Sequence, residues 1–355
     1  MRIDPPRIAD ARSLLARHFG PTRIARAASL SSPGCDVFLK LETDLPTGSF
    51  KVRGAIYSLS RAIGDGLQAV PRHSIAEVVC ASTGNHGAAV AYAARLLGVA
   101  ATIFLPDDPN PVKATRIRDL GAQIVEAGTD LSAAIDAAQA YARRIAAFFL
   151  HDASDPDVPV GTATIGAEVL DQLPEVDVLY VPMGDTALIR GVASAAKQRR
   201  PSIRVVGAVA ARAPAYLLSW QAQVRAEGLE RRADVVIETA TCDTIADGLA
   251  IRRPLAPNVA AIRELVDEVV AVSEEEMIAA IEWLYDREQV IAEPAGAAAT
   301  AALLKKPAAA RTSVVLVTGS NIAPDLDPVR REGTRGNEGD RGNGLTRINS
   351  GTKDP

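Results

Sequence analysis

Residues 77–97, EVVCASTGNHGAAVAYAARLL, have the pattern of a strand, a loop and a helix in succession. Residues 77–81 are mostly apolar and β-branched, as in a buried strand, and residues 88–97 form a longer Ala-rich run. The hexapeptide between them, Ser82-Thr83-Gly84-Asn85-His86-Gly87, is small, polar and Gly-bearing. This succession is typical of a parallel sheet covered by helices.

The same alternation extends along most of the chain. We expect further strands at residues 37–41, 101–105, 123–125, 178–181, 205–209 and 313–317. Further helices are expected at residues 111–120, 131–147, 187–198, 274–287 and 296–304, and Ser273 with Glu276 forms a capping box for the fourth of these. The pattern predicts a doubly wound α/β architecture, in which ligands lie at the carboxyl ends of the strands.

Composition limits the classes of protein that need to be considered. A chain of 355 residues with 48% hydrophobic and 23% charged residues is long enough for about two globular domains. Its net charge of -4 gives no basic field for a nucleic-acid partner.

The cysteines and the termini give no sign of a secreted or membrane protein. Cys35, Cys80 and Cys242 lie far apart in the sequence and form no CxxC pair, so neither a disulfide framework nor a zinc site is expected. The N-terminus lacks a signal peptide's apolar segment, and no apolar run reaches membrane-spanning length. We therefore expect a cytoplasmic protein without a membrane partner.

Residues 45–55, LPTGSFKVRGA, place Lys51 among small residues and one aromatic ring. A desolvated lysine there would have a lowered pKa, and its free amine could attack a carbonyl and hold a Schiff base. Considered alone, the segment also fits a solvated surface lysine beside Arg53.

The segment Ser49-Phe50-Lys51-Val52-Arg53-Gly54-Ala55 resembles the lysine motif of fold-type II pyridoxal-phosphate enzymes, in particular the serine/threonine dehydratase and serine racemase family. Four further motifs match in family order: residues 82–87, 244–248, 293–296 and 318–321. The resemblance covers roughly residues 10–325. It implies a fold like that of the tryptophan synthase β-subunit, with two doubly wound domains and pyridoxal 5'-phosphate in the cleft between them. We expect a large domain from residues 1–55 and 149–328 and a small mobile domain from 56–148. Residues 329–355, rich in Gly, Arg, Asn and Asp, are expected to form a disordered tail.

The resemblance also implies roles for single residues. Lys51 would hold the cofactor and remove the α-proton of the substrate, and Ser82 and Thr83 are further catalytic candidates. The substrate carboxylate would bind to the loop of Ser82, Thr83, Gly84, Asn85 and His86. Around the cofactor ring the resemblance places Phe50, Asn85, Gly248, Glu293 and Ser320. Ser320 would face the pyridine nitrogen, and a neutral hydroxyl there favours β-elimination. The alternative is that Ser320 only bonds loop backbone groups.

The phosphate loop departs from the family pattern. Relatives usually have four consecutive glycines there, whereas this chain has Gly184, Asp185, Thr186, Ala187 and Leu188. The backbone amides at this helix start could still bind the phosphate. Asp185 beside a dianion is unfavourable unless it points away or Arg190 offsets its charge.

Two other positions differ from some relatives. Residues 207–215 lack the carboxylates of a divalent metal site, so we expect no metal there. Thr83 stands where racemases have a serine base, and its methyl group disfavours racemisation as the main activity.

These observations predict a lyase that converts a β-hydroxy-α-amino acid into a 2-oxo acid and ammonia, acting as a homodimer or homotetramer. The altered loop leaves several substrates open: threonine, serine, phenylserine, hydroxyaspartate or a ring-opened acid derived from hydroxyectoine. A racemase, a β-replacement synthase and a non-enzymatic binding protein remain the alternatives.

Overall fold

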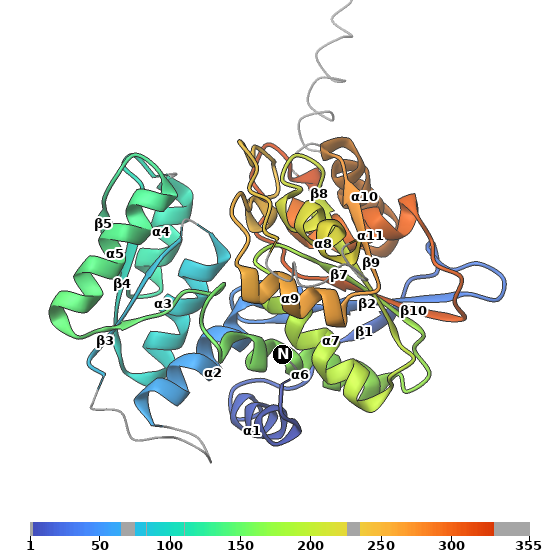
Figure 1. The fold of residues 1–355 in the computed structure, drawn as a ribbon, viewed down its shortest axis with the longest axis horizontal. Coiled ribbons are helices and arrows are strands. Elements are labelled where there is room, and N and C mark those ends of the chain that lie inside the picture. Colours follow the sequence, from blue (N-terminus) through green and yellow to red (C-terminus); the bar gives the residue numbers. More distant parts are fainter. Residues whose placement is uncertain (1–2, 65–74, 83, 110, 226–234, 330–355) are drawn as a thin grey trace, which may run out of the picture. The chain divides into compact units, whose positions relative to one another are not determined.

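The chain folds into two β-sheets with helices packed around them (Figure 1). The computed structural model describes residues 3–64, 75–82, 84–109, 111–225 and 235–329. Residues 1–321 form one compact unit, and the residues from Ile322 onward form a second. Of the expected tail at 329–355, all but Val329 lie outside the described residues.

The larger sheet has six strands in the order β1-β2-β10-β7-β8-β9. Their bounds are β1 Ile24–Arg26, β2 Asp36–Leu41, β7 Val178–Pro182, β8 Arg204–Ala210, β9 Glu268–Val272 and β10 Thr312–Val317. All neighbours are parallel except β1 and β2. The connection between those two is too short to hold a crossover helix, so β1 can only fold back on β2.

The smaller sheet has four parallel strands in the order β5-β4-β3-β6. They are β3 Glu77–Ala81, β4 Ala100–Leu105, β5 Gln123–Glu126 and the short β6 Phe148–Phe149. The helices that follow in this part of the chain are α3 Asn85–Leu97, α4 Pro111–Asp119 and α5 Leu131–Ile145.

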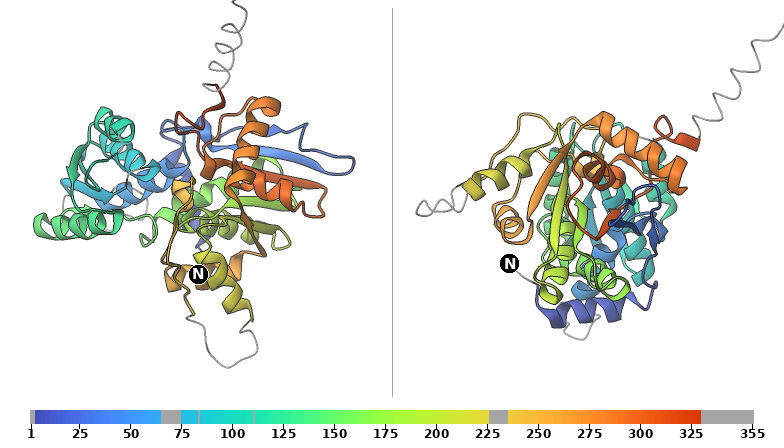
Figure 2. Two further views of the ribbon diagram at one scale, coloured as in Figure 1. Left: turned by 90° about the horizontal axis from the view of Figure 1, so that it is seen from above. Right: turned by 90° about the vertical axis from the view of Figure 1, so that its right-hand side faces the viewer.

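Helices cover the larger sheet as expected of a doubly wound fold (Figures 1 and 2). They are α1 Pro5–Leu15, α6 Val158–Gln172, α7 Ala187–Arg199, α8 Ala215–Arg225, α9 Ala256–Leu265, α10 Glu274–Glu288 and α11 Pro294–Lys305. Helix α11 packs directly on β7, β8, β9 and β10, because its small alanines and Gly296 permit close approach. Helices α6, α7 and α9 contribute the larger apolar side chains of the core.

Helix α2, Lys51–Ile63, packs against both α3 and α6 and so touches helices associated with each sheet. The expected domain boundary after residue 55 falls inside this helix. The division into a large and a small domain at that boundary therefore stays a prediction.

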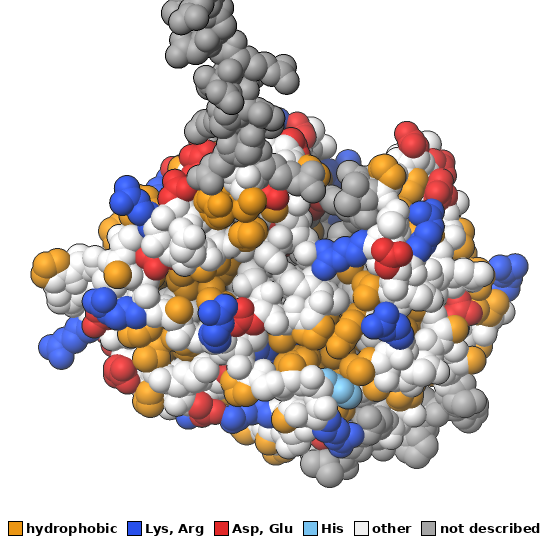
Figure 3. Space-filling view, turned by 180° about the vertical axis from the view of Figure 1, so that it is seen from behind, with side chains coloured by type: hydrophobic (Ala, Val, Ile, Leu, Met, Phe, Trp, Pro, Cys, Tyr) orange, Lys and Arg blue, Asp and Glu red, His pale blue; other side chains and the backbone are white. Residues whose placement is uncertain are grey.

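The predicted fold class is confirmed, and every strand expected from the sequence is present. The capping box of α10 is also confirmed, since Ser273 and Glu276 bond each other's backbone amides. Several elements were not expected from the sequence: strands β1, β6 and β9, and helices α1, α2, α6, α8 and α9. None of the described helices is long and apolar enough to span a membrane. On the face shown in Figure 3, basic and acidic side chains are interspersed.

The strand order brings distant sequence segments to one place. Strands β2, β10 and β7 are neighbours, so the loops after them, at residues 42–50, 318–321 and 183–186, meet at one edge of the sheet. Likewise β3 and β6 are neighbours, which brings Ser82 and Gly84 beside the segment that begins at residue 150. All of these segments follow the carboxyl ends of parallel strands, where ligands bind in such sheets.

Candidate active site

Lys51 is the first residue of α2, and hydrogen bonds of the preceding segment fix its place. Ser49 forms a β-bridge with Gly319, and the Phe50 amide donates to the Thr318 carbonyl at 3.1 Å. The Lys51 side chain is 17% exposed, and its ammonium lies 5.5 Å from the centre of the Phe50 ring. The lysine is thus directed into a largely enclosed region.

Two residues later, Arg53 lies in a fully buried network of charges. Its guanidinium bonds both carboxylate oxygens of Glu42, at 2.7 and 3.0 Å, and both of Glu168, at 2.6 and 3.0 Å. Lys40 donates to Glu168 as well, at 2.7 Å. Burial alone would lower the pKa of Arg53, but the two carboxylates outweigh burial and raise this pKa above its usual value. Arg53 therefore anchors the first turn of α2 to the core rather than lying on the surface.

The ammonium of Lys51 forms an ion pair with Asp152, which lies just beyond β6. Burial alone would lower the pKa of Lys51, but the charges of Asp152 and Asp185 and the hydrogen bond to Asp152 raise it. The lowered pKa expected from desolvation is therefore wrong, because two carboxyl groups face the amine. Burial would raise the pKa of Asp152, yet Lys51 and His86 hold it well below its usual range.

His86 lies behind this ion pair and is 7% exposed. Its Nε2 is 3.2 Å from the Leu150 carbonyl oxygen, and its Nδ1 is 3.8 Å from a carboxylate oxygen of Asp152. Burial lowers the pKa of His86, which favours the neutral ring with Nε2–H donating to the carbonyl. In that tautomer Nδ1 carries no proton, so His86 donates no hydrogen bond to Asp152.

Asp185, in the loop after β7, faces the same group. Its side chain hydrogen-bonds to Asp152. Burial is the largest cause, and the charge of Asp152 the second, of the rise of the Asp185 pKa to about 7. Arg190 and Lys51 act in the opposite direction. One carboxyl group of the pair is therefore ionised, and the other retains a proton to near neutral pH.

The loop of residues 184–186 contains one residue in a glycine-like backbone conformation and one position where only glycine fits. Thr186, which precedes α7, has φ of 71°, a left-handed conformation rare for a β-branched residue. A Cβ added to Gly184 would lie 2.1 Å from the Gly248 carbonyl oxygen, so only glycine fits there. Among the described residues, no side chain caps the start of α7. Ala187 and Leu188 are buried in its first turn, where backbone amides lack helical partners.

The loop after β3 leads into α3 in a similar way. The Gly84 amide donates to the Ser82 hydroxyl at 3.3 Å, and in the described part of the chain no side chain caps the helix, which begins at Asn85. Thr83 lies outside the described residues. The start of α3 therefore offers amides and a dipole that suit an anion such as a carboxylate.

Asn85 also connects this loop to the larger sheet. It donates to Glu293 at 2.5 Å and accepts a 2.5 Å hydrogen bond from Asn321, which donates to the Thr47 carbonyl as well. The Ser320 amide donates to the Gly48 carbonyl at 2.9 Å, while its hydroxyl lies 3.4 Å from the same oxygen. The second contact is long, so the hydroxyl remains suited to another partner.

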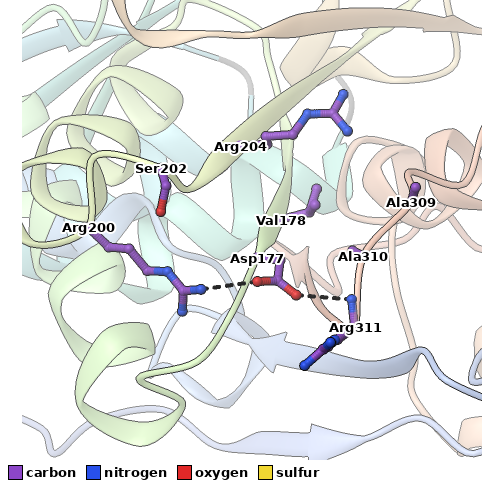
Figure 4. A pocket seen from close by; sticks show the side chains of 8 residues that line it. All are labelled: Asp177, Val178, Arg200, Ser202, Arg204, Ala309, Ala310 and Arg311. Atoms are coloured by element: carbon purple, nitrogen blue, oxygen red, sulfur yellow. Dashed lines mark hydrogen bonds and ion pairs between the residues drawn. The ribbon is translucent and has the colours of Figure 1, made fainter.

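A cavity of about 650 Å³ lies elsewhere. It is lined by Asp177, Val178, Arg200, Ser202, Arg204, Ala309, Ala310 and Arg311 (Figure 4). These residues cluster at the amino ends of β7, β8 and β10, whereas Lys51 and its partners follow carboxyl ends. The cavity is therefore separate from the candidate active site.

Comparison with known proteins agrees with this arrangement. Residues 15–319 match the family model described as pyridoxal-phosphate dependent enzyme. The chain belongs to this family.

Individual relatives of this pyridoxal-phosphate-dependent enzyme are also similar over most of their length. It is 36% identical over 292 residues to an L-threonine ammonia-lyase of Geobacter sulfurreducens, covering 81% of this chain and 68% of the relative. It is 35% identical over 317 residues to an L-threonine ammonia-lyase of Thermotoga maritima, covering 89% and 75%. The structure of maize serine racemase superposes with a TM-score of 0.82 at 26% identity, covering 96% of this chain and all of the racemase chain.

The residues present fit pyridoxal 5'-phosphate. Lys51 could supply a largely enclosed amine for the carbonyl of the cofactor, and the first turn of α7 could supply amides for its phosphate. Gly184 lies so close to the Gly248 carbonyl oxygen that no side chain fits between the two loops at this point. The structure brings together the predicted residues Lys51, Asn85, Glu293 and Ser320 around these features, although their individual roles remain predictions.

Sequence reasoning missed Asp152 and Asn321 as site residues. Asp152 follows β6, a strand of two residues that carries too short a pattern to be recognised. Asn321 belongs to the motif at residues 318–321, but its contact with Asn85 depends on how the two sheets meet. The only available signal was position, since both follow the carboxyl end of a strand.

Proposed function

We propose that this enzyme is a lyase that removes water from a β-hydroxy-α-amino acid and releases a 2-oxo acid and ammonia. The observation that carries the proposal is the position of Lys51, a largely enclosed amine that is paired with Asp152 and lies near Asp185 in the loop before α7. The names of the two ammonia-lyase relatives support it. The neutral hydroxyl of Ser320, in the position that favours elimination in this family, supports it further.

In the proposed mechanism each group of the chain has a separate task. The amides at the start of α3 hold the substrate carboxylate, and those at the start of α7 hold the cofactor phosphate. When bound, the cofactor supplies an electron sink for the pair released at the α-carbon. Lys51 takes the α-proton onto Nζ, and Asp152 stabilises the ammonium that results.

Threonine and serine are the first substrates to test, because the relatives are named for threonine. Phenylserine, hydroxyaspartate and the ring-opened acid derived from hydroxyectoine complete the panel, since the loop at Asp185 and Thr186 differs from the family pattern. The substrate that gives 2-oxo acid with the highest kcat/KM identifies the class.

Racemisation is the second candidate, and the superposition on maize serine racemase favours it. A racemase would convert L-serine to D-serine without releasing oxo acid. A β-replacement synthase would consume the amino acid only when a thiol is added.

We further propose that the active protein is a homodimer or homotetramer in the cytoplasm.

The test combines absorption spectroscopy with product analysis. We expect the wild-type protein to show a visible absorption band of bound cofactor that changes when the substrate is added, with release of oxo acid. Lys51→Ala should lose both the band and the product. Arg26→Ala, an exposed residue of β1, serves as the matched control and should keep both. A wild-type protein that binds the cofactor yet yields only D-amino acid would overturn the lyase assignment.

A further inference from the structure

Asp185 is a half-buried acid to which the proposed reaction assigns no task. It lies in the loop after β7, hydrogen-bonded to Asp152, which is ion-paired with Lys51. The three residues come from different segments: α2, the loop after β6 and the loop after β7. They form a continuous set of groups that can exchange protons, which we call the Lys51–Asp152–Asp185 triad.

We propose that Asp185 is the acid that protonates the β-hydroxyl of the substrate as it leaves. This proposal rests on the proposed function, because it concerns the same elimination. The geometry supports it in two ways. The leaving group is attached to the carbon next to the one that Lys51 deprotonates, so an acid beside Lys51 lies close to it. Asp185 also stands in the loop at the start of α7, which faces this region.

The two aspartates are suited to different tasks. Asp152 is kept ionised by the charge of Lys51, so it holds no proton to give to a leaving group but can accept one from Lys51. Burial and the charge of Asp152 raise the pKa of Asp185 to about 7, so this carboxyl group retains a proton under neutral conditions. A pair of carboxyl groups whose pKa values are driven apart is a common arrangement for acid and base roles.

The charged groups around Asp185 have opposing effects. Asp152 from the loop after β6 favours the protonated acid, whereas Lys51 on α2 and Arg190 on α7 favour the carboxylate. Tyr216 on α8 also lies near Asp185, and burial raises its pKa, so it is neutral. The titratable group that α3 contributes, His86, is neutral because burial lowers its pKa. Asp152 and burial outweigh the two cations.

The protons balance over one elimination. The α C–H bond breaks and its proton goes to Lys51. The electron pair forms the bond between the α- and β-carbons, and the β C–O bond breaks with its pair on oxygen. Asp185 gives this oxygen a proton, and water leaves. The proton on Lys51 then passes to Asp152 and on to Asp185, which restores the starting state without any other reactant.

Two substrates that differ in their need for an acid test the proposal. Serine must have its hydroxyl protonated, whereas β-chloroalanine loses chloride without a proton. Asp185→Asn should lower kcat/KM for serine by about 100-fold, the usual contribution of a general acid, with little change for β-chloroalanine. Asp185→Glu should restore part of the serine activity. Equal losses on the two substrates, or no loss on serine, would overturn the proposal.

The pH profile gives a second readout. Because the acid form of Asp185 is required, wild-type kcat/KM for serine should fall as the pH rises through about 7. The profile for β-chloroalanine should lack this fall. Identical profiles would contradict the role of Asp185. If threonine proves the better substrate, the same comparison is made with threonine in place of serine.

Infrared spectroscopy tests the proton directly and needs no turnover. The full-length protein should show a carboxylic acid C=O band that disappears as the pH rises through about 7. Asp185→Asn should lack this band, and Asp243→Asn, which changes a carboxylate whose side chain is 81% exposed, should keep it. A wild-type protein without the band has no protonated Asp185, and the proposal fails. If the band is present but neither substrate yields oxo acid, the proposed function fails instead.

Discussion

The guanidinium of Arg53 donates to both carboxylate oxygens of Glu168, at 2.6 and 3.0 Å, inside the core of the larger sheet. Arg53 belongs to the first turn of α2, and Glu168 belongs to α6. The pair therefore fixes the start of α2, including Lys51, against a helix that packs on the larger sheet. We therefore expect the position of the Lys51 amine to depend on this buried contact.

Replacing Arg53 with methionine should destabilise the protein by about 3–5 kcal/mol, because Glu42 and Glu168 would be left buried without their cation. Urea unfolding measures this free energy. Arg26→Met is the control, since Arg26 and Asp36 are both about half exposed and such pairs contribute about 1 kcal/mol or less. Similar losses for the two variants would show that the buried network is not the anchor.

Gly184→Ala should weaken cofactor binding by about tenfold or more, because a Cβ would lie 2.1 Å from the Gly248 carbonyl oxygen. Relieving that overlap requires the two loops to separate, at a cost of roughly 1–3 kcal/mol for a small-to-large change. Equilibrium dialysis against pyridoxal phosphate measures the dissociation constant. Gly20→Ala serves as the control, since no described atom lies within 4 Å of its added Cβ. Unchanged affinity in Gly184→Ala would show that this approach does not shape the phosphate loop.

Much of the fold was predictable because its signals are local. The strand at residues 77–81 and the capping box at Ser273 depend only on nearby residues, and both are present in the structure. The two-residue β6 and the short antiparallel β1 were missed, because short segments carry little periodicity. Helix α2 was missed because Val52 and Gly54, in its first turn, are weak helix formers.

The site was predictable only in part, for a different physical reason. Lys51, Asn85, Glu293 and Ser320 lie in motifs that could be matched one at a time. The ion pair of Lys51 with Asp152 joins residues 101 positions apart, and no local pattern encodes such a contact. For the same reason the expected lowering of the Lys51 pKa was wrong, since the neighbouring carboxyl groups come from remote segments.

Asp185→Asn should raise the thermal stability of the protein at pH 8 more than at pH 5. The pKa of Asp185 in the folded protein, about 7, lies above the usual value of a carboxyl group. Its contribution to stability is therefore complete below the usual carboxyl pKa and is lost as the pH rises through about 7. Asparagine stays neutral throughout, so the gain at pH 8 should reach roughly 2 kcal/mol, about half of what three pKa units would give.

Calorimetry at pH 5, 6, 7 and 8 measures this effect. Asp243→Asn, at an exposed site, should show no such pH trend. A pH-independent difference between Asp185→Asn and the wild type would mean that Asp185 is ionised throughout this range in the folded protein.

Asn85→Asp tests the chain of hydrogen bonds that joins α3 to the larger sheet. Asn85 donates to Glu293 at 2.5 Å, so a carboxylate in its place would face another carboxylate. Cofactor affinity should fall by about 10- to 100-fold at pH 8, from the loss of a hydrogen bond to a charged group. At pH 6 the loss should be smaller, because two adjacent carboxyl groups can share one proton.

Titration with pyridoxal phosphate at both pH values measures the affinity of Asn85→Asp. The control is Gln123→Glu, which makes the same change from amide to carboxylate at an exposed residue. Gln123 begins β5, at the amino end of a strand, whereas the site residues follow carboxyl ends, so this variant should leave the affinity unchanged. An equal loss for Asn85→Asp at both pH values would instead indicate that Asn85 acts through its shape rather than through its amide hydrogens.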